Sequence, residues 1–174
     1  NAIKPFPRVI GQATGGKVNI LGSTNYLYSV AYFDQNGRQV QAITQNHKGG
    51  NDRLTTLFDF AGRTLRTQMT HNNGTTTYVV KRRMEYDHGS RLKKMYHTFQ
   101  SDADEVLLTE NVYNEVGQLV LKKSNSRSGG PFAQQTDYRY HIRGWLERIN
   151  DPNAAAPNDL FSMSLYYDAP ASGE

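Results

Sequence analysis

The stretch Phe33-Asp34-Gln35-Asn36-Gly37-Arg38 is the first of five related stretches in this chain. Each has an aromatic residue, then an acidic or amide residue in most copies, and then a Gly a few places later. The aromatic residues are Phe33, Phe58, Tyr86, Tyr113, Tyr140 and Tyr167, separated by 25, 28, 27, 27 and 27 residues. An internal period of this length is typical of repeat proteins, in which each unit packs on its neighbours.

The residues that follow each aromatic favour a tight β-hairpin turn. An Asp or Asn at the first position hydrogen-bonds the backbone two residues on, and a Gly with positive φ closes a type I turn with a G1 bulge. The predicted turn residues are Asp34, Gly37, Arg38, Asp59, Gly62, Arg63, Asp87, Gly89, Arg91, Asn114, Gly117 and Gly144. These turns are centred on Asn36, Ala61, His88, Val116 and Arg143. Because Gly89 comes one place early, we expect a different turn type in the third repeat.

The turn geometry also predicts which residues face each other across each hairpin. The acidic residue lies opposite the residue after the Gly, which predicts the ion pairs Asp34–Arg38, Asp59–Arg63 and Asp87–Arg91. The aromatic residue lies opposite the residue two places after the Gly, which predicts Tyr86–Leu92, Tyr113–Leu119 and Tyr140–Leu146. In the first two repeats the sequence predicts a shift of one place, pairing Tyr32 with Val40 and Leu57 with Leu65.

Polar links rich in Asn, Asp, Ser, Gly and Pro separate the hairpins, at residues 45–52, 71–77, 100–105, 124–132 and 150–159. Tight turns that alternate with loose links predict an all-β fold, an antiparallel meander of repeated hairpins that is open or curled. Residues 24–168 are the expected repeat sheet, with five complete repeats and the start of a sixth. Residues 3–23 form an irregular lead-in with one strand.

Composition narrows the class of protein. The chain has 174 residues, a net charge of +4 and no Cys, which excludes a disulfide scaffold and thiolate metal sites. The mean hydropathy of −0.70 and the alternating polar residues predict that one sheet face is solvated. No apolar run is long enough for a membrane-spanning segment.

Both ends of the chain suggest an excised piece of a longer protein. Asn1-Ala2 without a Met resembles a scar left by tag removal. Tyr167 and Asp168 open a sixth repeat that the tail, residues 169–174, leaves incomplete. A sheet cut from a longer one exposes strand edges, so we expect self-association of the fragment through edge strands.

The recurring pattern of aromatic, Asp, two variable residues, Gly, Arg and Leu resembles the YD repeat of the Rhs (rearrangement hot spot) proteins. The similarity covers roughly residues 9–168 and is greatest to the Bacteroidetes branch of the family. The tracts that carry it are Tyr26-Leu-Tyr-Ser-Val-Ala-Tyr-Phe-Asp, Asn111-Val-Tyr-Asn-Glu-Val-Gly-Gln-Leu-Val, Ile142-Arg-Gly-Trp-Leu-Glu-Arg-Ile-Asn-Asp-Pro and Asp159-Leu-Phe-Ser-Met. The sequence departs from the family pattern at Gly89 and at His141, which replaces the Asp.

The resemblance implies a structural role without catalysis, as part of the wall of a larger β-shell. Rhs, teneurin and insecticidal toxin-complex proteins build a long sheet that spirals into a hollow β-shell, commonly around a toxic C-terminal domain. It also implies a secreted or cell-surface location. The partners it implies are neighbouring repeats and a C-terminal domain of the same parent chain.

The residues themselves predict no catalytic, cofactor or metal site. The five His residues are widely separated, and the acidic run Asp102-Ala-Asp104-Glu105 lacks the further ligand and the Gly of a calcium loop. Lys81-Arg82-Arg83, with Arg91, Lys93 and Lys94, suggests a positive patch. Because strand alternation sends these charges to both faces, we expect no nucleic-acid binding.

Aromatic residues leave a second function open. Trp145, Tyr138 and Tyr140 are candidates for stacking on a sugar ring, although cross-strand packing also explains the regular tyrosines. Two classes therefore remain: a structural segment of a shell, and a surface module for carbohydrate binding or cell adhesion.

Overall fold

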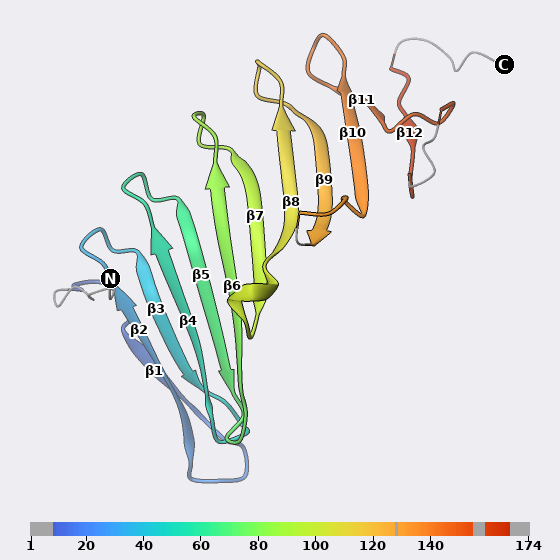
Figure 1. The fold of residues 1–174 in the computed structure, drawn as a ribbon. Helices are drawn as coiled ribbons and strands as arrows, with labels where there is room; N and C mark the ends of the chain where they lie inside the picture. Colours follow the sequence, from blue (N-terminus) through green and yellow to red (C-terminus); the bar gives the residue numbers. More distant parts are fainter. Residues whose placement is uncertain (1–8, 128, 155–158, 168–174) are drawn as a thin grey trace. The chain divides into compact units, whose positions relative to one another are not determined.

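The computed structural model describes residues 9–127, 129–154 and 159–167. The expected scar at residues 1–2 and the tail at 169–174 lie outside these ranges. Within them, twelve strands form one antiparallel sheet whose strand order follows the sequence. The predicted all-β hairpin meander is therefore confirmed (Figure 1). The same residues contain a single 3-10 turn, Asp102–Asp104, and no helix of the length and apolarity needed to cross a bilayer.

The chain divides into two compact units, one up to Met84 together with His97–Asp104, the other Glu85–Tyr96 together with the chain from Glu105 onward. The first unit holds the first five strands, most of β6 and the last residues of β7. Their bounds are β1 Gly15–Asn19, β2 Tyr26–Phe33, β3 Gln39–Gln45, β4 Asn51–Phe58, β5 Thr64–Asn72, β6 Thr77–Tyr86 and β7 Leu92–Phe99. The second unit holds the turn between β6 and β7 and the strands β8 Val106–Tyr113, β9 Leu119–Arg127, β10 Gln134–Tyr140, β11 Leu146–Ile149 and β12 Met163–Ser164.

All five tight turns have the same hydrogen-bond pattern. The first residue donates its N–H to the carbonyl of the fifth, and the fourth donates its N–H to the carbonyl of the first, as in Asp34–Arg38 and His141–Trp145. Four turns place a glycine with positive φ at the fourth position, as predicted: Gly37 (73°), Gly62 (88°), Gly117 (88°) and Gly144 (80°).

The expectation of a different turn in the third repeat is wrong. Ser90, not Gly89, occupies the fourth position there, with φ of 63°, and its N–H donates to the Asp87 carbonyl. The turn is thus centred on Gly89 rather than on His88. The spacing from Asp87 to Arg91 sets the turn, because the ion pair and two backbone bonds close around five residues wherever the Gly happens to fall.

The predicted one-place shift in the first two repeats is also wrong. Phe33 pairs with Gln39 and Tyr32 with Gln41, so that Val40 is an extra residue in a β-bulge. The second hairpin repeats this, with Phe58 opposite Thr64, Leu57 opposite Arg66, and Leu65 extra.

The later hairpins have the same bulge. Tyr113 pairs with Leu119 and Tyr140 with Leu146, as predicted, and a bulge follows each pair. A bulge one pair beyond the turn reverses the alternation of one strand and increases its local twist. All four hairpins therefore share one register, and the bulge residue absorbs the apparent shift in the apolar pattern.

Little of the sheet is buried. Among the described residues, Phe33 and Val40 are the buried hydrophobic side chains, with exposed fractions of 7% and 5%, and no large side chain is completely buried. Both lie where a bulge bends the strand. Since the sheet is a single layer, its stability depends on pairing and on contacts between neighbouring hairpins.

Candidate functional site

The predicted turn residues form ion pairs that also reach the next hairpin. In the first turn, Arg38 Nε donates to Asp34 Oδ2 at 2.6 Å, and its Nη1 donates to the backbone carbonyl of Asp59 at 3.1 Å. The Arg38 guanidinium lies 4.9 Å from the centre of the Phe58 ring. One arginine therefore closes its own turn and contacts the aromatic residue and the turn of the following repeat.

The second unit shows the same relation between its repeats. Arg91 pairs with Asp87 at 2.7 Å and lies 4.7 Å from the centre of the Tyr113 ring. A Cβ on Gly117 would approach Arg91 Nη1 to 3.0 Å, so a larger residue there would require the guanidinium to shift. Tyr113 completes the contact by donating its hydroxyl to the Leu92 carbonyl at 2.9 Å.

Asp-Arg closure is replaced by an amide pair in the fourth turn. Asn114 Nδ2 donates to Gln118 Oε1 at 2.8 Å, and the Gln118 N–H donates to Asn114 Oδ1 at 2.8 Å. Gln118 also extends to the next turn, where its Nε2 would lie 3.4 Å from a Cβ on Gly144. The contact between repeats is therefore kept when the charges are lost.

The three turn aspartates are stabilised in their ionised form. Burial raises the pKa of Asp34, but hydrogen bonds from the Arg38 backbone and guanidinium outweigh it, so the pKa lies below the ordinary 3.8. The pKa of Asp59 is lowered in the same way by Arg63, against the effect of burial. For Asp87 the backbone N–H of Arg91 is the largest influence, and the pKa is again lowered.

Trp145 occupies the place that arginine has in the first three turns and Gln118 has in the fourth. It stacks on His141, the residue in the Asp position, with ring centres 6.1 Å apart. Its other neighbour is Tyr167, the aromatic residue of the next repeat, at 5.2 Å. Tyr167 donates its hydroxyl to the Leu146 carbonyl at 2.7 Å, just as Tyr113, two repeats earlier, donates to the Leu92 carbonyl. Trp145 is 44% exposed and therefore combines a packing contact with an accessible ring surface.

The other two stacking candidates lie on β10. Tyr138 pairs with Ile149 and Tyr140 with Leu146 across the β10–β11 hairpin. Burial raises the pKa of the Tyr140 hydroxyl, and the neighbouring Tyr138 raises it further. Of the three aromatic candidates, Tyr138 alone lines the hollow described next.

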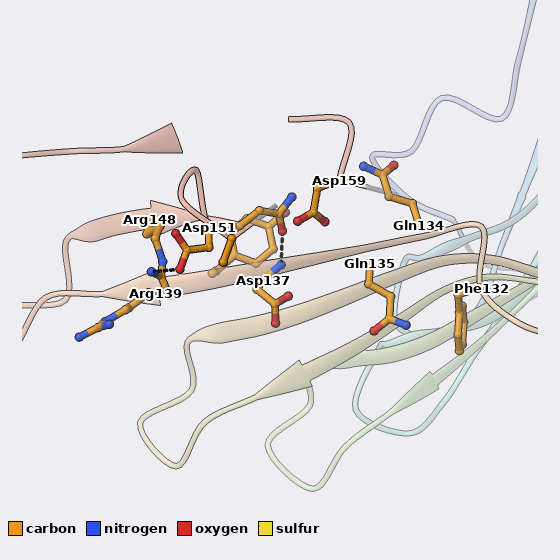
Figure 2. Close-up of a pocket in the computed structure, with 11 residues that line it drawn as sticks. Phe132, Gln134, Gln135, Asp137, Arg139, Arg148, Asp151 and Asp159 are labelled. Carbon is orange, nitrogen blue, oxygen red and sulfur yellow. Dashed lines mark hydrogen bonds and ion pairs between the residues drawn. The ribbon is translucent and has the colours of Figure 1, made fainter. Parts of the chain in front are cut away.

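A hollow of about 600 Å³ lies beside β10 in the second unit (Figure 2). Its lining residues are Phe132, Gln134, Gln135, Asp137, Tyr138, Arg139, Arg148, Asn150, Asp151, Ala154 and Asp159. Arg148 Nη1 donates to Asp151 Oδ2 at 2.7 Å, as the dashed line in Figure 2 marks. Arg139 extends away from the other labelled side chains, and its Nε lies 3.2 Å from Glu147 Oε2.

Asn150 organises the hollow and was not found by sequence reasoning. It is 4% exposed and has a φ of 48°. Its Oδ1 accepts the Asp137 N–H at 2.8 Å, and its Nδ2 donates to the Phe161 carbonyl at 2.7 Å. Asn150 thereby ties β10 to the segment before β12 and holds the wall of the hollow.

A similar device closes a loop in the first unit. Gln100 has a φ of 64°, and its Oε1 accepts the Val79 N–H at 2.9 Å while its own N–H donates to the Val79 carbonyl. Gln100, Asn125 and Asn150 all have positive φ and are spaced 25 residues apart. Amide residues at this spacing, near the C-terminal ends of β7, β9 and β11, are the sequence signal that identifies Asn150.

The hollow combines two aromatic rings, those of Phe132 and Tyr138, with amides, carboxylates and guanidinium groups. Such a combination suits a ligand with several hydroxyl groups, because planar polar side chains bind hydroxyls and a ring covers an apolar sugar face. Among the residues that the structure describes, no group of three or more His, Asp or Glu side chains is placed to hold a metal ion.

Comparison with protein-family models and with curated proteins finds no match to this chain.

Proposed function

We propose that this chain is a non-enzymatic structural repeat segment of a large secreted or cell-surface Rhs-type protein. In this role it forms part of a β-shell that encloses or displays a C-terminal domain, which can be toxic. The observation that carries the proposal is the contact from four of the five tight turns to the next repeat, made by Arg38, Arg91, Gln118 and Trp145.

These contacts suit a wall that is extended by adding hairpins. Each hairpin closes itself with its own five-residue turn, and the aromatic residues Phe58, Tyr113 and Tyr167 each contact a side chain of the preceding repeat. A repeat of this kind gains stability only from neighbours, which is the energetic pattern of solenoids and long sheets. Within the described residues β1 and β12 are the terminal strands of the sheet order, and further repeats can extend the sheet by pairing with them.

A role without catalysis agrees with the residues that recur. They are the ones needed for turn closure and for contacts between repeats. The closest approach to a catalytic pair is His71 Nδ1 with Asp52 Oδ1 at 2.5 Å, and Asp52 also accepts a hydrogen bond from Asn46 at 3.1 Å. His71 stacks on Tyr78, with 6.3 Å between ring centres, so this pair is explained as the closure of a loop end.

The shell proposal is tested on the natural reading frame that contains this chain. We expect further hairpin repeats on both sides and an unrelated small domain downstream. Co-expressed with the repeats, that domain should resist protease, and a Gly144→Val variant that disturbs one turn should expose it. A reading frame with no further repeats would rule the shell out.

Carbohydrate binding is the second candidate, because Tyr138 lies in the hollow with Gln134, Gln135 and Asp137. We expect Tyr138→Ala to abolish any binding seen on a glycan array. Tyr140→Ala is the matched control, since Tyr140 lies two residues along the same strand and outside the lining. If both variants bind as well as the parent, the hollow is not the site.

A further inference from the structure

Five polar or aromatic side chains form a straight row across the first unit. Tyr32 pairs with Gln41, Gln41 with Thr55, Thr55 with Gln68, and Gln68 with Lys81. Because paired residues in a sheet point to the same side, all five lie on one face. The row runs perpendicular to the strands of β2 to β6, over four strand spacings or roughly 19 Å. Gln41 Nε2 donates to Thr55 Oγ1 at 3.1 Å, which agrees with this arrangement.

Cationic side chains flank this row on the same face. Arg66 and Arg83 are paired on β5 and β6, two residues from Gln68 and Lys81 along their strands. Arg53 pairs with Ile43 and Thr70, two residues from Thr55 on the other side of the row. We call the row and these three arginines the basic face.

Two charges of the basic face, those of Arg53 and Arg66, are not explained by folding. Arg66 lies directly opposite a second arginine, Arg83, rather than opposite an acidic residue. Within the described residues, neither Arg53 nor Arg66 forms an ion pair. Lys81 does pair with Asp102 at 2.8 Å, but the Asp102 side chain is 73% exposed, and such surface pairs contribute little. An incoming anion can therefore replace Asp102.

The arrangement favours an acidic polysaccharide over a nucleic acid. Single-stranded nucleic acid is held by aromatic rings interleaved with cations, since its bases need stacking surfaces. Here the aromatic Tyr32 is at one end of the row, and Arg66 and Arg83 are near the other, with amide and hydroxyl groups between them. Amides and hydroxyls bind sugar hydroxyls, and guanidinium groups bind carboxylates in pairs of hydrogen bonds.

We propose that the basic face binds a linear polysaccharide that carries carboxylate groups, with the chain lying across strands β2 to β6 along the row from Tyr32 to Lys81. This site goes beyond a role as a wall segment, and it lies in the first unit, apart from the hollow beside β10. A wall segment without any ligand remains possible if this proposal fails, so the two are tested separately.

The experiment measures binding of a galacturonic acid hexamer to the purified chain by titration calorimetry at low salt. We expect affinity that falls as salt increases, because the contacts are largely ionic and screened. The double variant Arg53→Gln/Arg66→Gln should weaken binding by about tenfold or more, equivalent to about 1.4 kcal/mol. The affinity of Arg66→Lys, which keeps the charge but loses the paired hydrogen bonds of a guanidinium, should lie between that of the parent and that of the double variant.

The matched control is Arg82→Gln. Arg82 lies on β6 between Lys81 and Arg83 and pairs with Thr67, so its side chain points to the opposite face. This variant should bind the hexamer as the parent does. Circular dichroism should show that Arg82→Gln and the double variant are both folded.

Four outcomes would overturn the proposal. The first is no binding of the hexamer at millimolar concentration. The second is equal binding of the methyl-esterified hexamer, which has the same sugars without the charge. The third is a loss of affinity with Arg82→Gln as large as that with Arg53→Gln/Arg66→Gln. The fourth is tighter binding of a single-stranded oligonucleotide of similar length, which would assign the face to nucleic acid instead.

Discussion

At the scale of the residue, one backbone position in each tight turn decides how well the turn closes. Glycine fills it in four turns, and Ser90 fills it in the third with φ of 63°. Residues with a Cβ are strained in this left-handed region, which costs roughly 1–2 kcal/mol. The third turn therefore holds strain that the other four avoid.

Ser90→Gly should relieve this strain. We expect it to raise the free energy of unfolding by about 0.5–1 kcal/mol, because the gain is partly offset by the greater freedom of glycine in the unfolded chain. Urea denaturation followed by circular dichroism measures the change. The reverse substitution, Gly117→Ser, should be destabilising, since the serine would have to adopt a φ of 88°. Stability unchanged by both substitutions would contradict the strain argument.

Acid should weaken the turns through their aspartates. Folding lowers the pKa of Asp34, Asp59 and Asp87 below 3.8, so their stabilising effect is complete above this pH. This stabilisation is lost as the pH falls through the lowered pKa values, because the aspartates are then protonated in the folded protein and no longer form ion pairs. Denaturation midpoints across this range measure the effect.

Asp87→Asn provides the comparison for the acid dependence. The Asn114 turn shows that an amide in this position still closes the hairpin. The variant should fold, with a shallower loss of stability in acid than the parent. An identical pH profile for the two proteins would mean that Asp87 does not contribute.

At the scale of the element, backbone pairing joins each hairpin to the next, and a side chain after the turn adds a contact to the neighbouring repeat. Arg38 and Arg91 do this with a guanidinium over an aromatic ring, and Trp145 does it with an indole against Tyr167. Different chemistry thus fills one position, because a flat group with an extended surface is what the neighbouring ring requires.

Trp145→Ala should therefore destabilise the second unit. We expect a loss of about 1 kcal/mol in the free energy of unfolding, since aromatic pairs contribute about 0.5–1.5 kcal/mol beyond burial. The double variant His141→Asp/Trp145→Arg, which restores the pattern of the other turns, should recover most of this loss. Thermal melting measures both.

Phe60→Ala is the control for Trp145. Phe60 also lies in a tight turn, but it is fully exposed. Its removal should leave the melting temperature unchanged. If Trp145→Ala behaves in the same way, the indole is not a packing group, and its exposed surface becomes the better explanation of its presence.

At the scale of the whole molecule, the sheet relies on pairing rather than on a core. Among the described residues the buried hydrophobic side chains are confined to Phe33 and Val40. Backbone hydrogen bonds in a single layer are close to solvent on both sides, so local opening requires little loss of apolar contact.

Hydrogen exchange should follow this distribution within the first unit. β1, Gly15–Asn19, is exposed at every residue and is the first strand of the sheet order. Its amides should exchange before those of β4 and β5, which have paired strands on both sides. Mass spectrometry of peptic fragments measures the rates. Uniform protection from β1 to β5 would show that the unit opens only as a whole.

The sequence by itself determined the repeat period, the all-β meander, the tight turns and the ion pairs that close them. These features depend on about five consecutive residues, such as Asp34 to Arg38, whose turn preferences act locally. Only the tertiary structure decided the bulge at Val40, the role of Ser90, the position of Trp145 against Tyr167, and the hollow around Asn150. Ser90 takes its position from the spacing between Asp87 and Arg91, which outweighs the preference of Gly89 for positive φ. The bulge at Val40 depends on strand pairing, and the contacts of Trp145 and Asn150 are made to residues on other segments of the chain. Local turn chemistry does not encode these pairings, and so the candidate sites became visible only once the strands were paired.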